Sequence, residues 1–343
     1  MVKYEYKGNE IYPIVEIYHD AIVYLGGITM REFYQDKVKC AKAWRIAGEK
    51  IHEYFGDLLS IKNITGPPIS YGHIICLGSP VIFPENTEPN VRPMLASIDE
   101  GIDLLLKKRD IDYSQHPLFK HYYDICGYLK EQFPEQNVQF SGMGYEGPIT
   151  TAVLLRGHDF IYDIIDEPEK AKIFLTMLTN SIADFCHFIN RVNGIPEVNP
   201  NGAGLCDDFA SLISPNMWPE FVIPYWNQYY EKITTGKRWL HCENLAPEHI
   251  KYLKEVNLSH FQPSVSKMLT IENIKENTDV PFDWLLYAFE IIEMNDLQIE
   301  EWVDKTVQAG ITHVRTQFGR YACENNKLDR ILAFYKAFEK YKI

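Results

Sequence analysis

The sequence alternates between strand-like and helix-like segments along nearly its whole length, and this alternation limits the folds that the chain can adopt. Short apolar runs typical of strands cover residues 57–64, 73–78, 137–144, 202–209, 237–244, 256–262, 281–289 and 311–317. Each run is followed by a helical pattern or a long loop. Regular alternation over about 300 residues indicates a parallel sheet covered by helices, because each parallel connection needs a crossover.

Proline and glycine mark where the helical patterns begin and end. Gly56 ends the first pattern, and Pro117 and Pro168 open later ones. Helices are predicted over residues 30–55, 117–133, 147–155, 168–192, 215–233, 247–255, 271–277, 297–309 and 327–341. About eight strand–helix units favour a closed α/β fold, the (β/α)8 TIM barrel, over a doubly wound sheet. We expect one barrel domain over residues 1–343, with residues 1–56 as an N-terminal helical extension.

Charge and apolar content exclude several classes of partner. The chain has 34 Lys and Arg against 47 Asp and Glu, a formal charge of −13. Binding to nucleic acid or to an anionic membrane surface is therefore not expected, since both need clustered cations. No run approaches the roughly 20 apolar residues of a membrane span. Seven scattered cysteines without a C-x-x-C pair, and an N-terminus without an apolar signal core, are typical of a cytoplasmic protein.

His241 and Glu243 end one of the predicted strands, and barrel enzymes carry their reactive residues at such ends. Side chains two residues apart on a strand point to the same side, so both face one centre while Cys242 faces away. An imidazole and a carboxylate in this arrangement form half of a zinc site. The alternative is a hydrogen-bonded pair that closes the strand end.

Cys323 follows the last predicted strand and is the candidate for a third zinc ligand. Three protein ligands with one open position are the catalytic form of zinc. Cys206 and Cys242 compete for this role, and Cys206 ends another strand.

Carboxylates at other strand ends are candidates for catalysis. Glu146 lies at a strand-to-helix turn, and Asp207 and Asp208 end a further strand. Such a carboxylate acts as a general acid or fixes a substrate hydroxyl. For Glu146 the alternative is an acid in the first turn of the following helix. Of the adjacent Asp pair, we expect one side chain to point inward and the other outward.

Three stretches together resemble the uroporphyrinogen decarboxylase superfamily over roughly residues 20–340. Residues 142–179 resemble its Gly-Pro-Thr turn, helix and D-x-P-E helix start, and residues 207–226 its ISP…F…P segment. Residues 238–256 resemble the strand that carries its L-H-x-C-G signature. Decarboxylases of this superfamily bind a tetrapyrrole with many carboxylates through an N-terminal R-Q-A-G-R-Y segment. Here the first 90 residues contain only Arg31 and Arg45, which argues against that substrate.

The resemblance therefore favours the other branch, the cobalamin-dependent methyltransferases, whose barrels hold zinc through His-x-Cys and a later Cys. His241 matches the His, Glu243 stands where the first Cys is expected, and Cys323 lies about three residues from the last Cys. The resemblance implies zinc, a partner corrinoid protein carrying cobalamin, and a small-molecule methyl donor or acceptor. Glu in place of Cys hardens the ligand set, which favours O-demethylation of a methyl ether.

Three other functions remain as alternatives. They are methyl transfer from methylcobalamin to a thiol of the coenzyme M type, decarboxylation of uroporphyrinogen, and a non-catalytic barrel that serves as a binding subunit.

Overall fold

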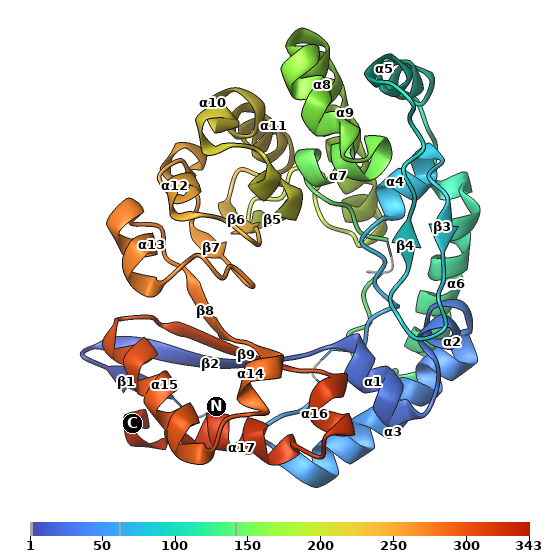
Figure 1. The fold of residues 1–343 in the computed structure, drawn as a ribbon. Coiled ribbons are helices and arrows are strands. Elements are labelled where there is room, and N and C mark those ends of the chain that lie inside the picture. Colours follow the sequence, from blue (N-terminus) through green and yellow to red (C-terminus); the bar gives the residue numbers. More distant parts are fainter. Residues whose placement is uncertain (1–2, 62, 141–142) are drawn as a thin grey trace. The chain divides into compact units, whose positions relative to one another are not determined.

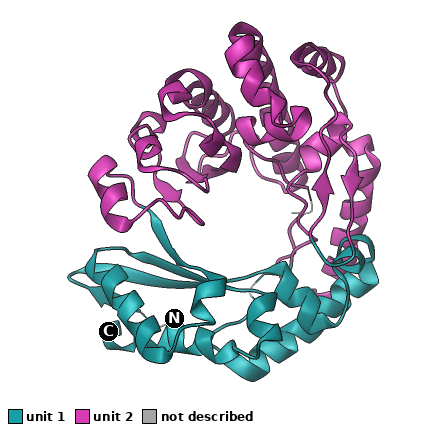
Figure 2. Ribbon diagram, in the orientation of Figure 1, with its two compact units in different colours: residues 1–64, 85–87, 282–343 teal, residues 65–84, 88–281 magenta. Residues whose placement is uncertain are grey.

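The computed structural model describes residues 3–61, 63–140 and 143–343 of the chain (Figure 1). The chain divides into two compact units (Figure 2). Unit 1 comprises residues 1–64, 85–87 and 282–343, and unit 2 comprises residues 65–84 and 88–281.

Unit 1 is built on a four-stranded sheet in the order β1-β2-β9-β8. Its strands are β1 (Tyr4–Tyr6), β2 (Asn9–Ile17), β8 (Asp283–Leu286) and β9 (His313–Phe318). The β1–β2 pair is an antiparallel hairpin, whereas β2 and β8 both run parallel to β9. Lys7 and Gly8 make the hairpin loop, and both have the positive φ that a two-residue turn of this kind requires. The sequence analysis assigned no strand to residues 1–56, so β1 and β2 are additions.

Unit 1 also contains helices from both ends of the chain. They are α1 (His19–Gly26), α2 (Met30–Gln35), α3 (Lys37–Phe55), α14 (Ala288–Ile291), α15 (Asp296–Gln308), α16 (Arg320–Glu324) and α17 (Leu328–Lys336). The predicted helix over 30–55 is present but divided at Asp36. That side chain accepts hydrogen bonds from the Val38 and Lys39 backbone and so begins α3. Gly26 lets α1 approach α3, because a Cβ there would lie 2.6 Å from the Ala43 Cα.

Unit 2 contains a parallel sheet in the order β5-β6-β7. Its strands are β5 (Gly202–Cys206), β6 (Lys237–His241) and β7 (His260–Gln262), and a small antiparallel pair joins β3 (Val81–Ile82) to β4 (Asn90–Val91). All three parallel strands lie where the sequence analysis predicted strands. Its helices are α4 (Gly72–Leu77), α5 (Ile98–Lys107), α6 (Pro117–Gln132), α7 (Pro148–Arg156), α8 (Asp159–Asp166), α9 (Pro168–Val192), α10 (Trp218–Phe221), α11 (Ile223–Ile233), α12 (Pro247–Ile250) and α13 (Ile271–Asn277).

Three predicted strands are corrected by the structure. Residues 73–77 lie in α4, a helix whose residues are all buried, and the described residues of 57–64 contain no strand. Of the strand predicted over 137–144, Gln139 makes a single parallel bridge with Thr65, and residues 141–142 lie outside the described residues. A fully apolar run has no periodicity, so it fits a buried helix as well as a buried strand.

The fold is thus mixed α/β, with parallel strand pairs in both units and helices between the strands. In the part of the chain that the structure describes, the strands form three separate hydrogen-bonded sheets. No helix there is both long enough and apolar enough to cross a membrane.

Candidate functional site

One row of polar side chains crosses the carboxyl ends of the three parallel strands of unit 2. Cys206 is in register with His241, and His241 with Gln262. Residues in register on neighbouring strands point to the same face of the sheet. The row before them points to the opposite face and is apolar and buried: Leu205, Leu240 and Phe261. Burial of that row fixes which face carries the polar residues.

His241 is held by a partner on each of its ring nitrogens. Its Nδ1 donates to the Gln262 Oε1 at 2.6 Å, and its Nε2 lies 3.6 Å from both the Asp208 Oδ1 and the Glu243 Oε1. Burial by itself lowers the pKa of His241, but the hydrogen bond with Glu243 and the charge of Asp208 outweigh it and raise the pKa to about 9. The structure therefore brings His241 and Glu243 to one centre, together with Asp208.

Asp208 links the segments that follow β5 and β6. Its Oδ1 accepts a hydrogen bond of 2.9 Å from the Glu243 backbone N–H. Burial, opposed by the charge of His241, raises the pKa of Asp208, whereas the hydrogen bond with His241 lowers the pKa of Glu243. One imidazole nitrogen thus faces two half-buried carboxylates.

These three groups fit the donor set of a divalent metal. Ligand atoms of a tetrahedral zinc site lie about 3.4 Å apart when each bond is 2.0–2.1 Å. The two measured N···O distances of 3.6 Å are close to that value. The Nδ1 hydrogen bond to Gln262 is the kind of support that metal-ligating histidines receive. It holds a proton on Nδ1, so Nε2 is the nitrogen that would lose its proton and bind the metal.

Asp207 points away from this cluster and is fully buried. Its carboxylate accepts hydrogen bonds from the backbone N–H groups of Thr150 (2.7 Å) and Ile149 (3.3 Å) and from the Trp226 indole (2.6 Å). It closes the N-terminus of α7, where Gly147 has no capping side chain, and a Cβ on Gly147 would lie 2.4 Å from the carboxylate carbon. Burial raises the pKa of Asp207 to about 6 although these hydrogen bonds oppose the shift.

Glu146 precedes α7 and is half-buried. Burial, followed by the charges of Asp208 and Asp207, raises the pKa of Glu146 to about 8, and the charge of His241 only partly opposes this. The carboxyl therefore keeps its proton near neutral pH. A protonated carboxyl beside ionised ones has the division of roles that acid–base catalysis requires.

The three candidate cysteines lie in different surroundings. Cys242 is buried and its thiol donates to the Asp207 carbonyl at 3.1 Å, on the other side of the chain from His241. Cys206 shares the row of His241. Cys323 lies on α16 of unit 1, where burial and then the charge of Asp20 raise the pKa of its thiol to about 12.

Sequence reasoning missed Gln262, which fixes the imidazole. Its one signal was its position at the end of a predicted strand. The sequence also did not show which of the two adjacent aspartates faces His241. The structure shows that Asp208 does, whereas Asp207 caps α7.

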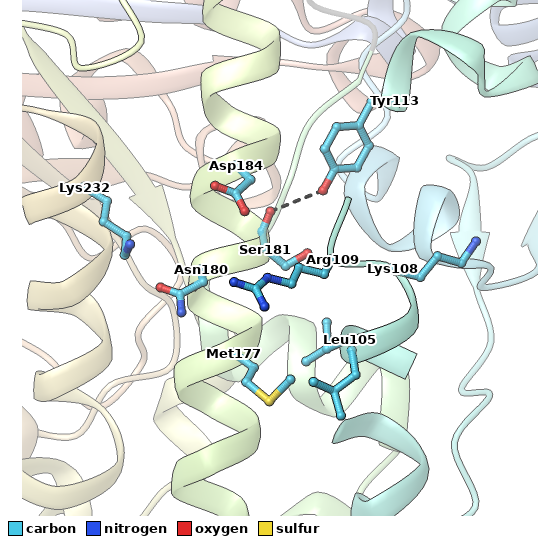
Figure 3. A pocket seen from close by; sticks show the side chains of 10 residues that line it. Leu105, Lys108, Arg109, Tyr113, Met177, Asn180, Ser181, Asp184 and Lys232 are labelled. Atoms are coloured by element: carbon cyan, nitrogen blue, oxygen red, sulfur yellow. Dashed lines mark hydrogen bonds between the residues drawn. The ribbon is translucent and has the colours of Figure 1, made fainter. Parts of the chain in front are cut away.

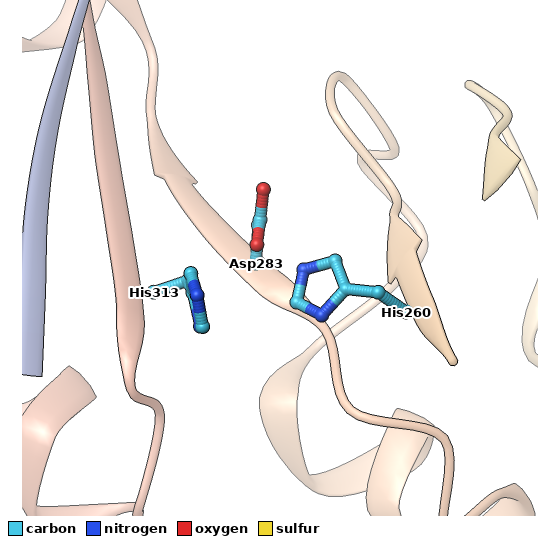
Figure 4. Close-up of side chains that lie close together, drawn as sticks. All are labelled: His260, Asp283 and His313. Atoms are coloured by element: carbon cyan, nitrogen blue, oxygen red, sulfur yellow. The ribbon is translucent and has the colours of Figure 1, made fainter. Parts of the chain in front are cut away.

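Two further polar groupings lie outside this cluster. In unit 2, a cavity is lined by charged residues of the segment after α5 and of α9 and α11 (Figure 3). In unit 1, Asp283 and His313 are in register on β8 and β9 (Figure 4), and the buried Asp283 carboxylate accepts a hydrogen bond from the Arg315 guanidinium. The charge of Asp283 is therefore balanced within unit 1.

Comparison with known proteins identifies the family of the chain. The family model for uroporphyrinogen decarboxylase (URO-D) matches residues 73–277, which is more than half of the chain. The chain belongs to this family, as the sequence motifs predicted. A search of curated proteins gave no match.

Among solved structures, the chain is similar to a methyltransferase from Methanosarcina mazei. The TM-score is 0.69 at 15% sequence identity, and the match covers 96% of this chain and 94% of that one. The two chains therefore share a fold over almost their full lengths.

Proposed function

We propose that the protein is a zinc-dependent methyltransferase. It moves a methyl group between a small substrate, an O-methyl donor, and the cobalt of a partner corrinoid protein. The observation that carries this proposal is the position of the His241 Nε2, 3.6 Å from two carboxylate oxygens with its other nitrogen fixed by Gln262. The shared fold with a methyltransferase supports it.

We also propose that the chain forms the (β/α)8 barrel of its family as a single domain. The parallel pairing in each unit and the near-complete match to a methyltransferase fold support this architecture.

His241 and Glu243 would hold the zinc. Asp208 is the third candidate within unit 2, and Cys323 is the third ligand that the family resemblance implies. Bound zinc would supply a Lewis acid at the heteroatom of the substrate. Gln262 keeps the imidazole in the ligating tautomer, and Glu146 holds the proton that the departing oxygen needs. Asp207 holds α7 in place and contacts no substrate.

The charge of the cluster argues against the decarboxylase alternative. The Asp208 and Glu243 carboxylates both face His241, and their charges would repel a substrate that carries many carboxylates. The same cluster suits a cationic metal.

The test combines metal analysis with a transfer assay. The purified protein should hold about one zinc per chain, and His241→Ala should lose it, whereas His158→Ala on the exposed start of α8 should keep it. Mixed with a reduced corrinoid protein and candidate methyl ethers, the wild-type protein should convert the cob(I)alamin absorption spectrum to that of methylcobalamin. Zinc retained in His241→Ala would refute the metal site. Turnover of uroporphyrinogen would refute the choice of branch.

A further inference from the structure

Unit 2 contains a cavity of about 470 Å³ that is lined by none of the residues of the His241 cluster. Its walls come from the end of α5 and the segment after it, from α9, and from Lys232 of α11 (Figure 3). Its volume falls in the range of small-molecule sites.

Positive charge dominates the lining of this cavity. Lys108, Arg109 and Lys232 line it together with a single carboxylate, Asp184. None of the three cations makes an ion pair with a residue that the structure describes. Acidic residues outnumber basic ones in this chain by 47 to 34, so a cluster of unpaired cations runs against its overall charge.

Two neutral side chains add hydrogen-bond donors to the same wall. The Oδ1 of Asn180 accepts from the Gln228 side chain at 2.8 Å, so the Asn180 amide nitrogen is the atom left to face the cavity. The Ser181 Oγ lies 2.9 Å from the Nε2 of His73. Figure 3 shows Asn180 and Ser181 on one face of α9, with Arg109 directed toward them.

His73 determines which way the Ser181 hydroxyl points. The imidazole is 1% exposed, and its Nδ1 has no hydrogen-bond partner among the described residues. Burial lowers the pKa of His73 to about 3, so the ring is neutral and carries one N–H. A buried N–H group without a hydrogen-bond partner is rarer in proteins than a buried acceptor without one. We therefore place the hydrogen of His73 on Nε2, where it donates to the Ser181 Oγ, and leave Nδ1 as the acceptor without a partner. The hydroxyl hydrogen of Ser181 is then available to a ligand.

We propose that this cavity binds the phosphate group of a small phosphorylated molecule. The guanidinium, the ammonium groups, the amide and the hydroxyl are all donors, so they match a group that only accepts hydrogen bonds. The three cations and one carboxylate leave a net charge of +2, which a dianionic phosphate neutralises and a single carboxylate does not. Leu105, Leu106 and Met177 supply an apolar wall for the organic part of the ligand.

Phenyl phosphate is a suitable probe, because it joins a dianion to a small apolar group. Calorimetric titration of the full chain, without corrinoid or methyl donor, should show saturable binding, with phenyl phosphate tighter than inorganic phosphate and benzoate weakest. Arg109→Gln and Lys232→Gln should each weaken the affinity about tenfold, as expected for loss of one charge-assisted contact. Both residues are exposed, so these variants should fold.

Two control variants make the test specific. Asp184→Asn removes the only carboxylate of the lining and should tighten phenyl phosphate binding several-fold. Lys130→Gln, an exposed lysine on α6 outside the cavity, should leave the affinity unchanged within twofold.

Equal affinity in wild type, Arg109→Gln and Lys232→Gln would overturn the proposal, and so would benzoate binding more tightly than phenyl phosphate. Binding of polyglutamate without binding of phenyl phosphate would also overturn it, because the surface would then serve an acidic protein partner. These measurements do not depend on zinc or methyl transfer, so the proposed enzymatic function can fail without affecting them.

Discussion

Gln262 orients His241 across two neighbouring strands. The two residues are in register on β7 and β6, and the Gln262 Oε1 accepts the Nδ1 hydrogen at 2.6 Å. The imidazole is thereby fixed with Nε2 toward Asp208 and Glu243. A hydrogen-bond acceptor of this kind fixes the orientation of a ligating histidine ring and increases its basicity.

Replacing Gln262 should therefore weaken zinc binding without abolishing it. Gln262→Met keeps a similar volume but removes the acceptor, and we expect zinc affinity to fall about 10- to 100-fold. Competition with a chromogenic chelator measures the change. His241→Ala, which removes the ligand itself, should lose far more affinity. If Gln262→Met binds zinc as tightly as wild type, the hydrogen bond has no role in the site.

The same Asp→Asn change should affect stability at Asp207 and zinc binding at Asp208. Asp207→Asn should lower the free energy of unfolding by about 2–3 kcal/mol, because an amide cannot accept all three buried hydrogen bonds. Its zinc content should be unchanged. Asp208→Asn should unfold near the wild-type urea concentration but bind zinc at least tenfold more weakly.

Urea unfolding and metal analysis of both variants check this prediction. Cys323→Ser in the same series identifies the third ligand. If Asp208→Asn keeps full zinc affinity and Cys323→Ser loses it, the third ligand is the cysteine.

Glu146 should make the stability of the zinc-free protein depend on pH. The pKa of Glu146 is about 8 in the folded chain and near its usual 4.5 when unfolded. Between these values the unfolded chain has lost a proton that the folded chain keeps, so this contribution to stability falls as pH rises and levels off above pH 8. Glu146→Gln should remove that slope, and the variant should gain stability relative to wild type from pH 5 to pH 9.

Urea unfolding of wild type and Glu146→Gln at pH 5, 7 and 9 measures the difference directly. His241 titrates in both proteins, so the difference between the two curves reports Glu146 together with its charge interaction with His241. In the transfer assay Glu146→Gln should lose about 100-fold in rate with its zinc retained. Parallel pH curves for the two proteins would show that Glu146 is ionised throughout.

Glu243 is the main departure from the family pattern, and its replacement tests the harder ligand set. Glu243→Cys should keep zinc, because a thiolate is a good ligand, but should slow ether demethylation more than it weakens metal binding. Glu243→Gln should lower zinc affinity, because a neutral amide is a poor ligand. Metal content and rate are compared in the same preparations. Full zinc and full activity in both variants would exclude Glu243 as a ligand.

Local sequence signals predicted the elements that carry their own boundaries. The helix over Pro168–Val192 begins and ends as predicted, because Pro168 fixes its first turn and apolar residues recur along one face. The run over 73–78 was misassigned because every residue of α4 is buried, which removes the periodicity that separates helix from strand. Strands β1 and β2 were missed because β1 is only three residues long and Pro13 interrupts the β2 pattern.

The candidate site could be predicted only in part. The i, i+2 spacing was enough to suggest that His241 and Glu243 share a centre, although β6 itself ends at His241 and Glu243 lies in the segment that follows it. The contribution of Gln262 depends on the register between β6 and β7, which no local pattern encodes. Asp207 and Asp208 are identical in type and adjacent in sequence, so only tertiary structure shows that one serves α7 and the other faces His241.

The capping of α7 by Asp207 constrains the order in which this helix can form during translation. The first backbone N–H groups of this helix are bonded to Asp207, which comes much later in the chain. During synthesis, these N–H groups lack their Asp207 partner until residue 207 has left the ribosome. A nascent chain that pauses before that point exposes an unfinished helix end to chaperones and proteases.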